Sequence, residues 1–193
     1  MALLTASAGE RATCEQHTRA RSALFALVLL LSSPWHLFAQ TAPIPDYQVK
    51  AVFLFNFAQF VSWPSQESSD APFVIGILGD DPFGSYLDET VRGEKVNGRS
   101  LTIQRLRRGA EPRNSNILFI AQSERDRAAQ IVSNLKGRSV LTVSDIDGFA
   151  ELGGMIQFFM ENKKIRMRIN LEAVKAANLK VSSKLLRVAE VAH

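Results

Sequence analysis

Residues Phe73–Gly84 have the sequence FVIGILGDDPFG, and this segment determines the expected fold class. Its first half, residues 73–78, is an almost continuous apolar run, and its second half contains two glycines, two aspartates and a proline. A short apolar run that ends in turn-forming residues is typical of a strand buried on both faces of a parallel sheet. We expect Asp80 or Asp81 to cap a following helix, with Pro82 at its first position.

The segments on either side of residues 73–84 continue the alternation of strand and helix. Apolar runs bounded by polar loops predict further strands, and amphipathic segments between them predict helices. Alternation of this kind indicates right-handed crossovers between parallel strands. The expected fold class is therefore α/β, with a mostly parallel central sheet and helices on both faces. The expected strands are Ser100–Leu106, Ile117–Ala121 and Ser139–Val143, and the expected helices are Phe83–Val91, with Tyr86, Leu87 and Val91 inward, and Glu124–Leu135, capped by Ser123.

The pattern changes in the C-terminal part of the chain. Two segments, Met155–Glu161 and Lys164–Asn170, flank the turn-forming pair Asn162-Lys163, so we expect an antiparallel hairpin. Its second arm alternates apolar residues with lysine and arginine. Such a cationic row usually protects an exposed edge strand, and a partner surface is the alternative. The expected terminal helices are Leu171–Ala177, capped by Asn170, and a last helix from Ser182 or Ser183 to Val191.

The first helix of the domain is expected over Asp46–Trp63, with Pro64 ending it. Val49 and three phenylalanines share one helical face, but Val52 and Phe55 lie off that face, so the helix is apolar around most of its circumference. Such a helix is either buried on more than one side or docked on another molecule. A core helix is the favoured interpretation, and a partner or dimer surface that includes Val52 and Phe55 is the alternative.

Residues 1–39 have the features of an export signal. Three arginines precede the apolar run ALFALVLLL, and the small residue Ala39 stands before Gln40. This order of basic, apolar and small residues predicts a secretory signal peptide, cleaved between Ala39 and Gln40. The alternative is a retained membrane anchor, but the apolar run is shorter than the roughly 20 residues that a membrane span needs. Residues 40–193 then form a single domain.

Composition argues against several classes of function. The formal net charge of the whole chain is +4, which is too mild to indicate a nucleic-acid-binding protein. Cys14 is the only cysteine and lies in the leader, and His193 is the only histidine of residues 40–193. Cysteine nucleophiles, serine–histidine pairs and zinc sites all need residues that this domain lacks. The sequence therefore predicts no enzyme, no cofactor and no metal.

Two loops are the candidates for a ligand or partner crevice. Residues 79–84 and 144–154 each follow a predicted parallel strand, and the carboxyl ends of such strands form the usual binding edge of an α/β sheet. An acid–base pair at Asp80 and Asp81 is less favoured than a helix cap, and the glycine spacing does not match a dinucleotide-binding loop. The residues proposed for this crevice are Asp80, Asp81, Phe83, Asp145 and Phe149.

Several segments together resemble the YfiR-like family of exported proteins. They are VKAVFLFNFAQFVSWP (49–64), IGILGDDPFG (75–84), Ile117–Ala121 with Ser123-Glu124-Arg125, LTVSDIDGFAELGGMI (141–156) and INLEAVKAANLKVSSKLLRVA (169–189). The resemblance covers nearly all of the chain after the leader. It implies a periplasmic α/β protein without catalysis, often a homodimer. The disulfide-forming cysteines of characterised members are absent from residues 40–193.

Two functional hypotheses follow. Characterised members of the family repress a membrane-bound diguanylate cyclase by contacting its periplasmic sensor region, which lowers cyclic di-GMP and biofilm formation. The resemblance therefore implies an interaction protein of this kind. The alternative is a periplasmic module that binds a small molecule in the crevice near Asp80, Asp81, Asp145 and Phe149.

Overall fold

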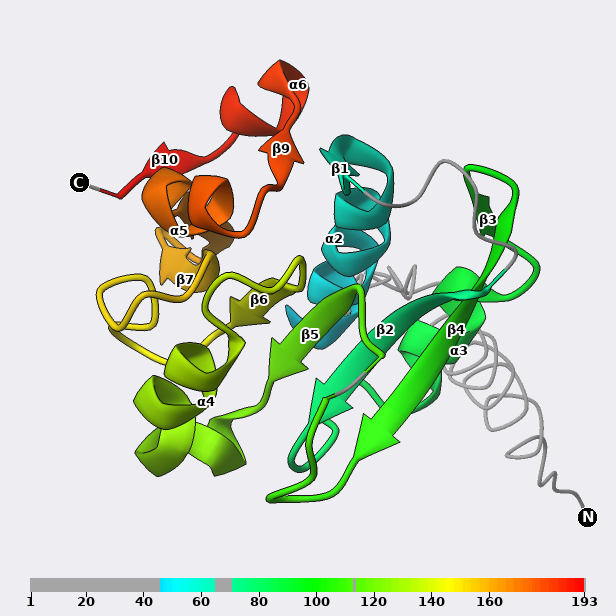
Figure 1. Cartoon of the computed structure of the whole chain (residues 1–193), viewed down its shortest axis with the longest axis horizontal. Helices are drawn as coiled ribbons and strands as arrows, with labels where there is room; N and C mark the ends of the chain where they lie inside the picture. The colour runs from blue at the N-terminus through cyan, green and yellow to red at the C-terminus, as the bar shows by residue number, and fades with distance from the viewer. Residues whose placement is uncertain (1–45, 65–70, 113, 193) are drawn as a thin grey trace, which may run out of the picture. The chain divides into compact units, whose positions relative to one another are not determined.

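The segment Phe73–Leu78 forms strand β2, inside a mostly parallel sheet of eight strands (Figure 1). The structure is a computed structural model that describes residues 46–64, 71–112 and 114–192, all within the unit Pro43–His193. The predicted signal peptide and its cleavage site, Ala39 and Gln40, lie outside the described residues. The strand order is β10-β8-β7-β6-β5-β2-β4-β3.

Five consecutive strands of this sheet, β7-β6-β5-β2-β4, run parallel, as the alternating sequence predicts. Strand β2 pairs with β4 (Arg99–Leu106) on one side and with β5 (Ile117–Ile120) on the other, and β5 pairs with β6 (Leu141–Ser144). All four residues of β5 and of β6 are buried, which explains why β5 is apolar throughout, whereas β6 also buries the hydroxyls of Thr142 and Ser144. A short strand, β3 (Lys95–Val96), forms one edge of the sheet against β4.

The predicted hairpin is present as β7 (Ile156–Glu161) and β8 (Lys164–Ile169). Its turn residues Asn162 and Lys163 have φ of 49° and 60°, the conformation that two-residue hairpin loops require. Strand β8 is not the outermost strand over its whole length, because β10 (Glu190–Val191) pairs with its last residues in parallel. The prediction of a last helix to Val191 is therefore wrong: helix α6 covers only Ser183–Leu186, and the chain then returns to the sheet.

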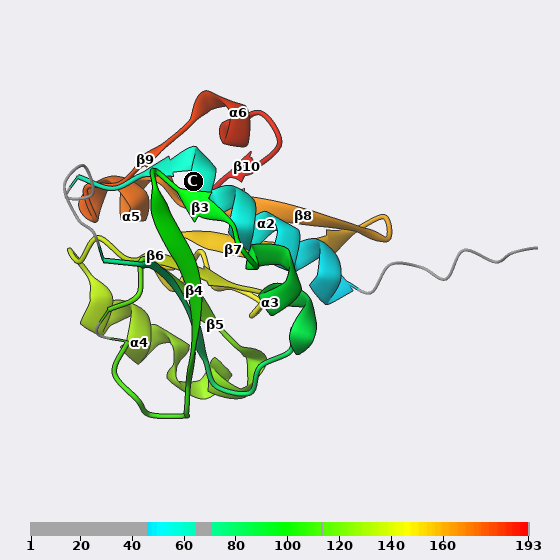
Figure 2. The same ribbon diagram turned by 90° about the vertical axis from the view of Figure 1, so that its right-hand side faces the viewer.

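Helices cover both faces of the sheet (Figure 2). Helices α2 (Asp46–Phe60) and α3 (Ser85–Val91) pack into the larger hydrophobic cluster, together with side chains such as Phe73 and Phe119. Helix α4 (Ala128–Leu135) packs into a second cluster on the other face. The predicted α/β fold class is confirmed. In α3, Leu87 and Val91 are buried as predicted, whereas Tyr86 is exposed.

Helix α2 ends three residues earlier than predicted. Val61 and Ser62 form strand β1, which pairs with β9 (Lys180–Val181) in a separate two-stranded antiparallel sheet. The buried face of α2 also differs from the predicted stripe of Val49 and phenylalanines, because it includes Lys50 and Leu54. When a helix is apolar around most of its circumference, the sequence pattern does not show which face is buried, and tertiary contacts determine its orientation.

Of the predicted N-cap residues, some cap a helix in the structure and others do not. Asn170 caps α5 (Leu171–Ala176) as predicted, since its side chain accepts a hydrogen bond from the N–H of Ala173 at 2.9 Å. Asp81 does not cap α3: its Oδ1 accepts the N–H of Phe83 at 2.8 Å, and the helix begins two residues later. Ser123 does not cap an α-helix either, because residues 122–127 form the 3₁₀ helix η1 ahead of α4.

Candidate functional site

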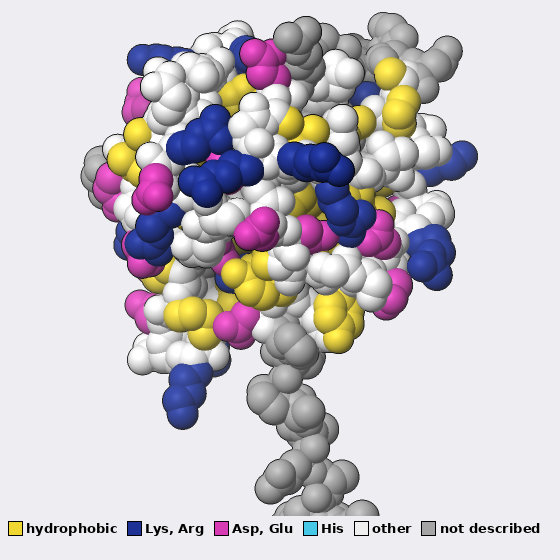
Figure 3. Space-filling view, turned by 90° about the horizontal axis from the view of Figure 1, so that it is seen from below, with side chains coloured by type: hydrophobic (Ala, Val, Ile, Leu, Met, Phe, Trp, Pro, Cys, Tyr) yellow, Lys and Arg dark blue, Asp and Glu magenta, His cyan; other side chains and the backbone are white. Residues whose placement is uncertain are grey.

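The loops that follow β2, β5 and β6 meet at the carboxyl edge of the sheet, as the parallel arrangement requires. Figure 3 looks onto the end of the molecule toward which β2, β4 and β5 point in Figure 1. Basic and acidic side chains lie next to one another on this face, rather than forming a patch of one sign. Such an arrangement favours local ion pairs over a long-range field that would attract a polyanion.

Asp145, in the loop after β6, is the centre of a polar cluster at this edge. Its Oδ2 accepts hydrogen bonds from Lys50 Nζ at 2.6 Å and from the hydroxyl of Tyr47 at 2.9 Å. Its Oδ1 accepts one from Gln122 Nε2 at 3.1 Å, and the same amide also donates to the Asp145 carbonyl. The side chains of Lys50 and Asp145 are only 10% and 8% exposed. This buried ion pair fastens the first half of α2 to the loop after β6.

Tyr47 connects this cluster to a second predicted site residue, Phe83. The two rings meet edge to face, with their centroids 5.6 Å apart. Burial, and then the hydrogen bond to Asp145, raise the pKa of Tyr47 to about 12, because both favour the neutral phenol beside a carboxylate. Lys50 Nζ lies 4.2 Å from the centroid of the same ring, within the range of a cation–π contact. The structure therefore brings Asp145 and Phe83 together through α2.

Tyr47 and Lys50 were not among the predicted site residues. A signal for Lys50 was present, since it is the one lysine within an otherwise mostly apolar helix. A lysine at a buried position needs a partner carboxylate, so its position alone indicated an ion pair. The identity of that partner was not predictable from local sequence, because Asp145 is 95 residues away.

The two neighbouring aspartates after β2 have different partners. The backbone N–H of Asp80 donates to Ser123 Oγ at 2.8 Å, which closes the loop after β2 against the start of η1. Asp81 Oδ2 lies 2.7 Å from Nε of Arg105, and the same guanidinium contacts Asp88 on α3. The hydrogen bond from Arg105 lowers the pKa of Asp88 and raises the pKa of Arg105. Asp81 therefore belongs to a surface ion-pair network.

Phe149 is separated from the other proposed crevice residues. It is fully buried in the hydrophobic cluster that includes α4, whereas Phe83 belongs to the cluster on the opposite face of the sheet. Gly154 packs directly against its ring, because a Cβ added at this glycine would lie 2.2 Å from a ring carbon. The position of Phe149 is therefore explained by packing of the core.

The two residues proposed for a partner or dimer surface differ in exposure. Val52 is 49% exposed and lies on the outer side of α2. Phe55, expected to be exposed, is instead partly buried against the larger hydrophobic cluster. Val52 therefore remains the main candidate for a contact from this helix.

The described residues contain no group of three or more His, Cys, Asp or Glu side chains placed to hold a metal ion. Within the same residues, no helix is both long enough and apolar enough to cross a membrane. Asp145, Asp81 and Asp88 at the carboxyl edge are engaged with Lys50 and Arg105 in the pairs described above. Their geometry is that of structural ion pairs between helices, loops and strands.

Comparison with protein families identifies the domain. The model of a family described as YfiR/HmsC-like matches residues 47–190, which include every strand of the eight-stranded sheet except the last residue of β10. This chain belongs to the YfiR/HmsC-like family. The resemblance inferred from the sequence segments is thereby confirmed. No curated protein matches the chain by sequence. YfiR-like proteins are regulatory proteins that interact with partner signalling proteins.

Proposed function

We propose that this YfiR-like protein is exported to the periplasm and represses an inner-membrane diguanylate cyclase through the periplasmic sensor region of the cyclase. Repression lowers cyclic di-GMP. The observation that supports this proposal most directly is the family match, which spans almost the whole described domain. The export signal predicted over residues 1–39 supports this proposal, because export would bring the protein to the compartment where such a sensor region is accessible.

The physical basis of repression is a difference in affinity between two states of the cyclase. A regulator shifts the cyclase toward an inactive conformation only if it binds that conformation more tightly. Each tenfold preference is worth about 1.4 kcal/mol, and a shift from mostly active to mostly inactive needs a preference of roughly 10⁴-fold. Such discrimination is easier for a rigid surface than for a mobile one, because less ordering is required on binding.

Helix α2 is a rigid element of this kind with one exposed apolar side chain. Its inner side is held by the Lys50–Asp145 ion pair and by Leu54 and Phe57, both fully buried. Its outer side presents Val52 to solvent. We propose that the outer side of α2 contacts the sensor region. We also propose that the protein acts as a homodimer, which sedimentation of the purified protein measures.

The test is binding between protein purified from the full-length gene and the isolated periplasmic region of the cyclase. Val52→Asp is expected to weaken binding at least tenfold, because a carboxylate is desolvated against an apolar contact, and to leave the melting temperature unchanged. Val188→Asp is the matched control, since Val188 is also exposed, at 58% against 49% for Val52, but lies after α6. Absence of association, together with unchanged cyclic di-GMP in a deletion strain, would refute the repressor function.

A further inference from the structure

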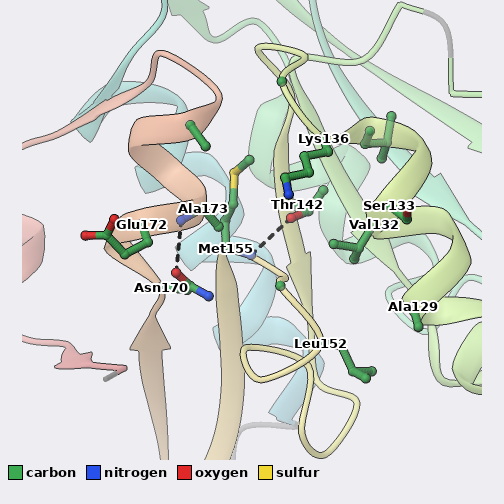
Figure 4. Close-up of a pocket in the computed structure, with 14 residues that line it drawn as sticks. Ala129, Val132, Ser133, Lys136, Thr142, Leu152, Met155, Asn170, Glu172 and Ala173 are labelled. Atoms are coloured by element: carbon green, nitrogen blue, oxygen red, sulfur yellow. Dashed lines mark hydrogen bonds between the residues drawn. The ribbon is translucent and has the colours of Figure 1, made fainter.

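A cavity of about 530 Å³ opens between helices α4 and α5 (Figure 4). Its floor is formed where β6 begins and where the chain enters β7. None of its lining residues belongs to the Asp145 cluster. A volume of this size is typical of sites that enclose a small molecule. The apolar part of the lining consists of Ala129, Val132, Leu135, Leu152, Met155, Ala173 and Ala176.

One cationic side chain, that of the solvent-exposed Lys136, lines the rim of this mostly apolar cavity. Lys136 is the C-cap residue directly after α4, and Figure 4 shows its side chain pointing in the direction of Thr142. No described residue forms an ion pair or a hydrogen bond with its ammonium group. Glu172, on the opposite wall, is turned away in Figure 4, and its carboxylate lies 3.4 Å from the ammonium of Lys175. The cavity therefore contains one positive charge without a protein counter-ion.

Thr142 adds a second polar group near the same place. It is only 2% exposed, and its Oγ1 accepts the N–H of Met155 at 3.1 Å. Its hydroxyl hydrogen makes no bond to another described residue. The partly buried side-chain amide of Asn170 is already engaged, because it donates to Ala150 O at 3.0 Å and accepts from Ala173 N. Besides the hydroxyl of the exposed Ser133, the lining side-chain groups without a partner among the described residues are thus the ammonium of Lys136 and the hydroxyl of Thr142, and both donate hydrogen bonds.

We propose that this cavity binds a small organic monocarboxylate with an apolar body. Its carboxylate accepts hydrogen bonds from Lys136 and Thr142, which supply charge and direction. Its apolar body replaces water against Val132, Leu152 and Met155. A single ammonium balances one negative charge, so a monoanion fits better than a phosphate dianion. This inference is independent of the proposed repressor function, because its test measures binding to this chain alone.

Lys136 also has a structural role that the test must separate from binding. A cation at the C-terminal end of a helix interacts favourably with the helix dipole, so loss of Lys136 is expected to lower stability slightly. That role predicts no difference in binding between an acid and an alcohol that share the same apolar chain. Discrimination between these two ligands therefore isolates the role of the ammonium in recognition.

The experiment is a titration of isotope-labelled protein, expressed from the full-length gene, followed by amide chemical shifts in NMR. The probes are hexanoate and 1-hexanol, which share an apolar chain and differ in charge. Hexanoate is expected to produce saturable shifts at Gly137, Thr142, Gly153 and Ala173. Hexanol is expected to bind at the same place at least fivefold more weakly. Equal affinity for the two probes, or shifts confined to another part of the domain, would overturn the proposal.

Substitutions give the second arm of the test. Lys136→Met is expected to lower the affinity for hexanoate at least fivefold without changing the affinity for hexanol. Lys184→Met removes an exposed charge elsewhere and is expected to leave both affinities unchanged. Ala176→Trp fills the cavity from an exposed position on its wall and is expected to abolish binding of both probes. If Lys136→Met and Lys184→Met behave alike, or if Ala176→Trp still binds hexanoate, the assignment of this cavity is wrong.

Discussion

Two ion-pair networks at the carboxyl edge of the sheet have similar chemistry and very different surroundings. In the first, Lys50 on α2 meets Asp145 after β6, and both side chains are at most 10% exposed. In the second, Arg105 on β4 meets Asp81 and Asp88, and the guanidinium and the Asp88 carboxylate are each 43% exposed, while the Asp81 side chain is 15% exposed. Each network joins a helix to the sheet. The first joins α2, and the second joins α3.

The comparison shows that exposure, rather than distance, determines what each pair contributes. The contacts are equally short, at 2.6 Å for Lys50–Asp145 and 2.7 Å for Arg105–Asp81. Water screens the second pair, and exposed pairs typically contribute about 0–1 kcal/mol. Breaking a buried pair leaves an uncompensated charge in a medium of low polarity and costs about 3–5 kcal/mol. The orientation of α2 therefore depends on its ion pair far more than the orientation of α3 does.

The largest expected effect is that of Lys50→Met. Methionine keeps most of the apolar stem but removes the charge, so Asp145 remains buried without its cation. We expect the free energy of unfolding to fall by about 3 kcal/mol. Urea denaturation measures this loss. Lys184→Met, which removes an exposed charge, is the control and is expected to change the unfolding free energy by less than about 0.5 kcal/mol.

The double variant Lys50→Met/Asp145→Asn tests the cause of that loss. It removes both charges and keeps an oxygen that can accept the hydrogen bond from Tyr47. We expect it to recover most of the stability, because an uncharged pair carries a much smaller desolvation penalty. If the double variant were as unstable as the sum of the two single variants, burial of an unpaired charge would not explain the effect.

The sequence was sufficient to predict the parts of the fold that depend on local pattern. The buried strands β2 and β5 are apolar because both of their faces are covered, and the hairpin turn at Asn162 and Lys163 has its own conformational signal. The Asn170 cap was predictable for the same reason, since its partner is three residues away. Strand β10 was not predictable, because it contains two residues and is defined only by pairing with β8.

The candidate site was predicted less well because it depends on contacts between distant residues. Asp145 and Phe83 were identified from their loops, but Tyr47, which joins them, lies on a helix whose buried face the sequence pattern did not reveal. Asp80 or Asp81 was expected to cap a helix, and the structure uses Asp81 for the turn before Phe83 and for Arg105 instead. Local rules allow both roles for an aspartate before proline, and the burial of Phe83 decides between them.

An intermediate effect is expected at Tyr47. Its pKa in the folded protein is raised to about 12 from the ordinary value of 10.0, so the stability that this shift contributes is fully present below pH 10 and is lost as the pH rises through 12. The chain has two tyrosines, and Tyr86→Phe therefore leaves Tyr47 as the only one to titrate. Its ultraviolet absorbance is expected to report ionisation near pH 12.

The variant Tyr47→Phe completes this test. It removes one hydrogen bond to a buried carboxylate and is expected to lower the free energy of unfolding by about 1–2 kcal/mol at neutral pH. Above pH 10 the difference from the unsubstituted protein is expected to shrink, because only the protein with Tyr47 loses stability as its phenol ionises. Ionisation of Tyr47 near pH 10, the ordinary value for a tyrosine, would show that it is not buried against Asp145.

The smallest effect is expected for Arg105→Gln, and its dependence on salt and pH separates the two networks. Arg105 lowers the pKa of Asp88, so the stability from this contact is present above about pH 4 and is lost as the pH falls through the lowered pKa of the folded state. At neutral pH and low salt we expect the free energy of unfolding to fall by less than about 1 kcal/mol, and this loss disappears in 1 M salt because both partners are screened.

Arg166→Gln, which breaks another exposed pair with Glu161, is the matched control and is expected to behave in the same way. If Arg105→Gln lowered the free energy of unfolding by as much as is expected for Lys50→Met, and if this loss persisted in high salt, α3 would be held as firmly as α2. The position of α3 would then depend on its ion pairs as strongly as the position of α2 depends on Lys50–Asp145.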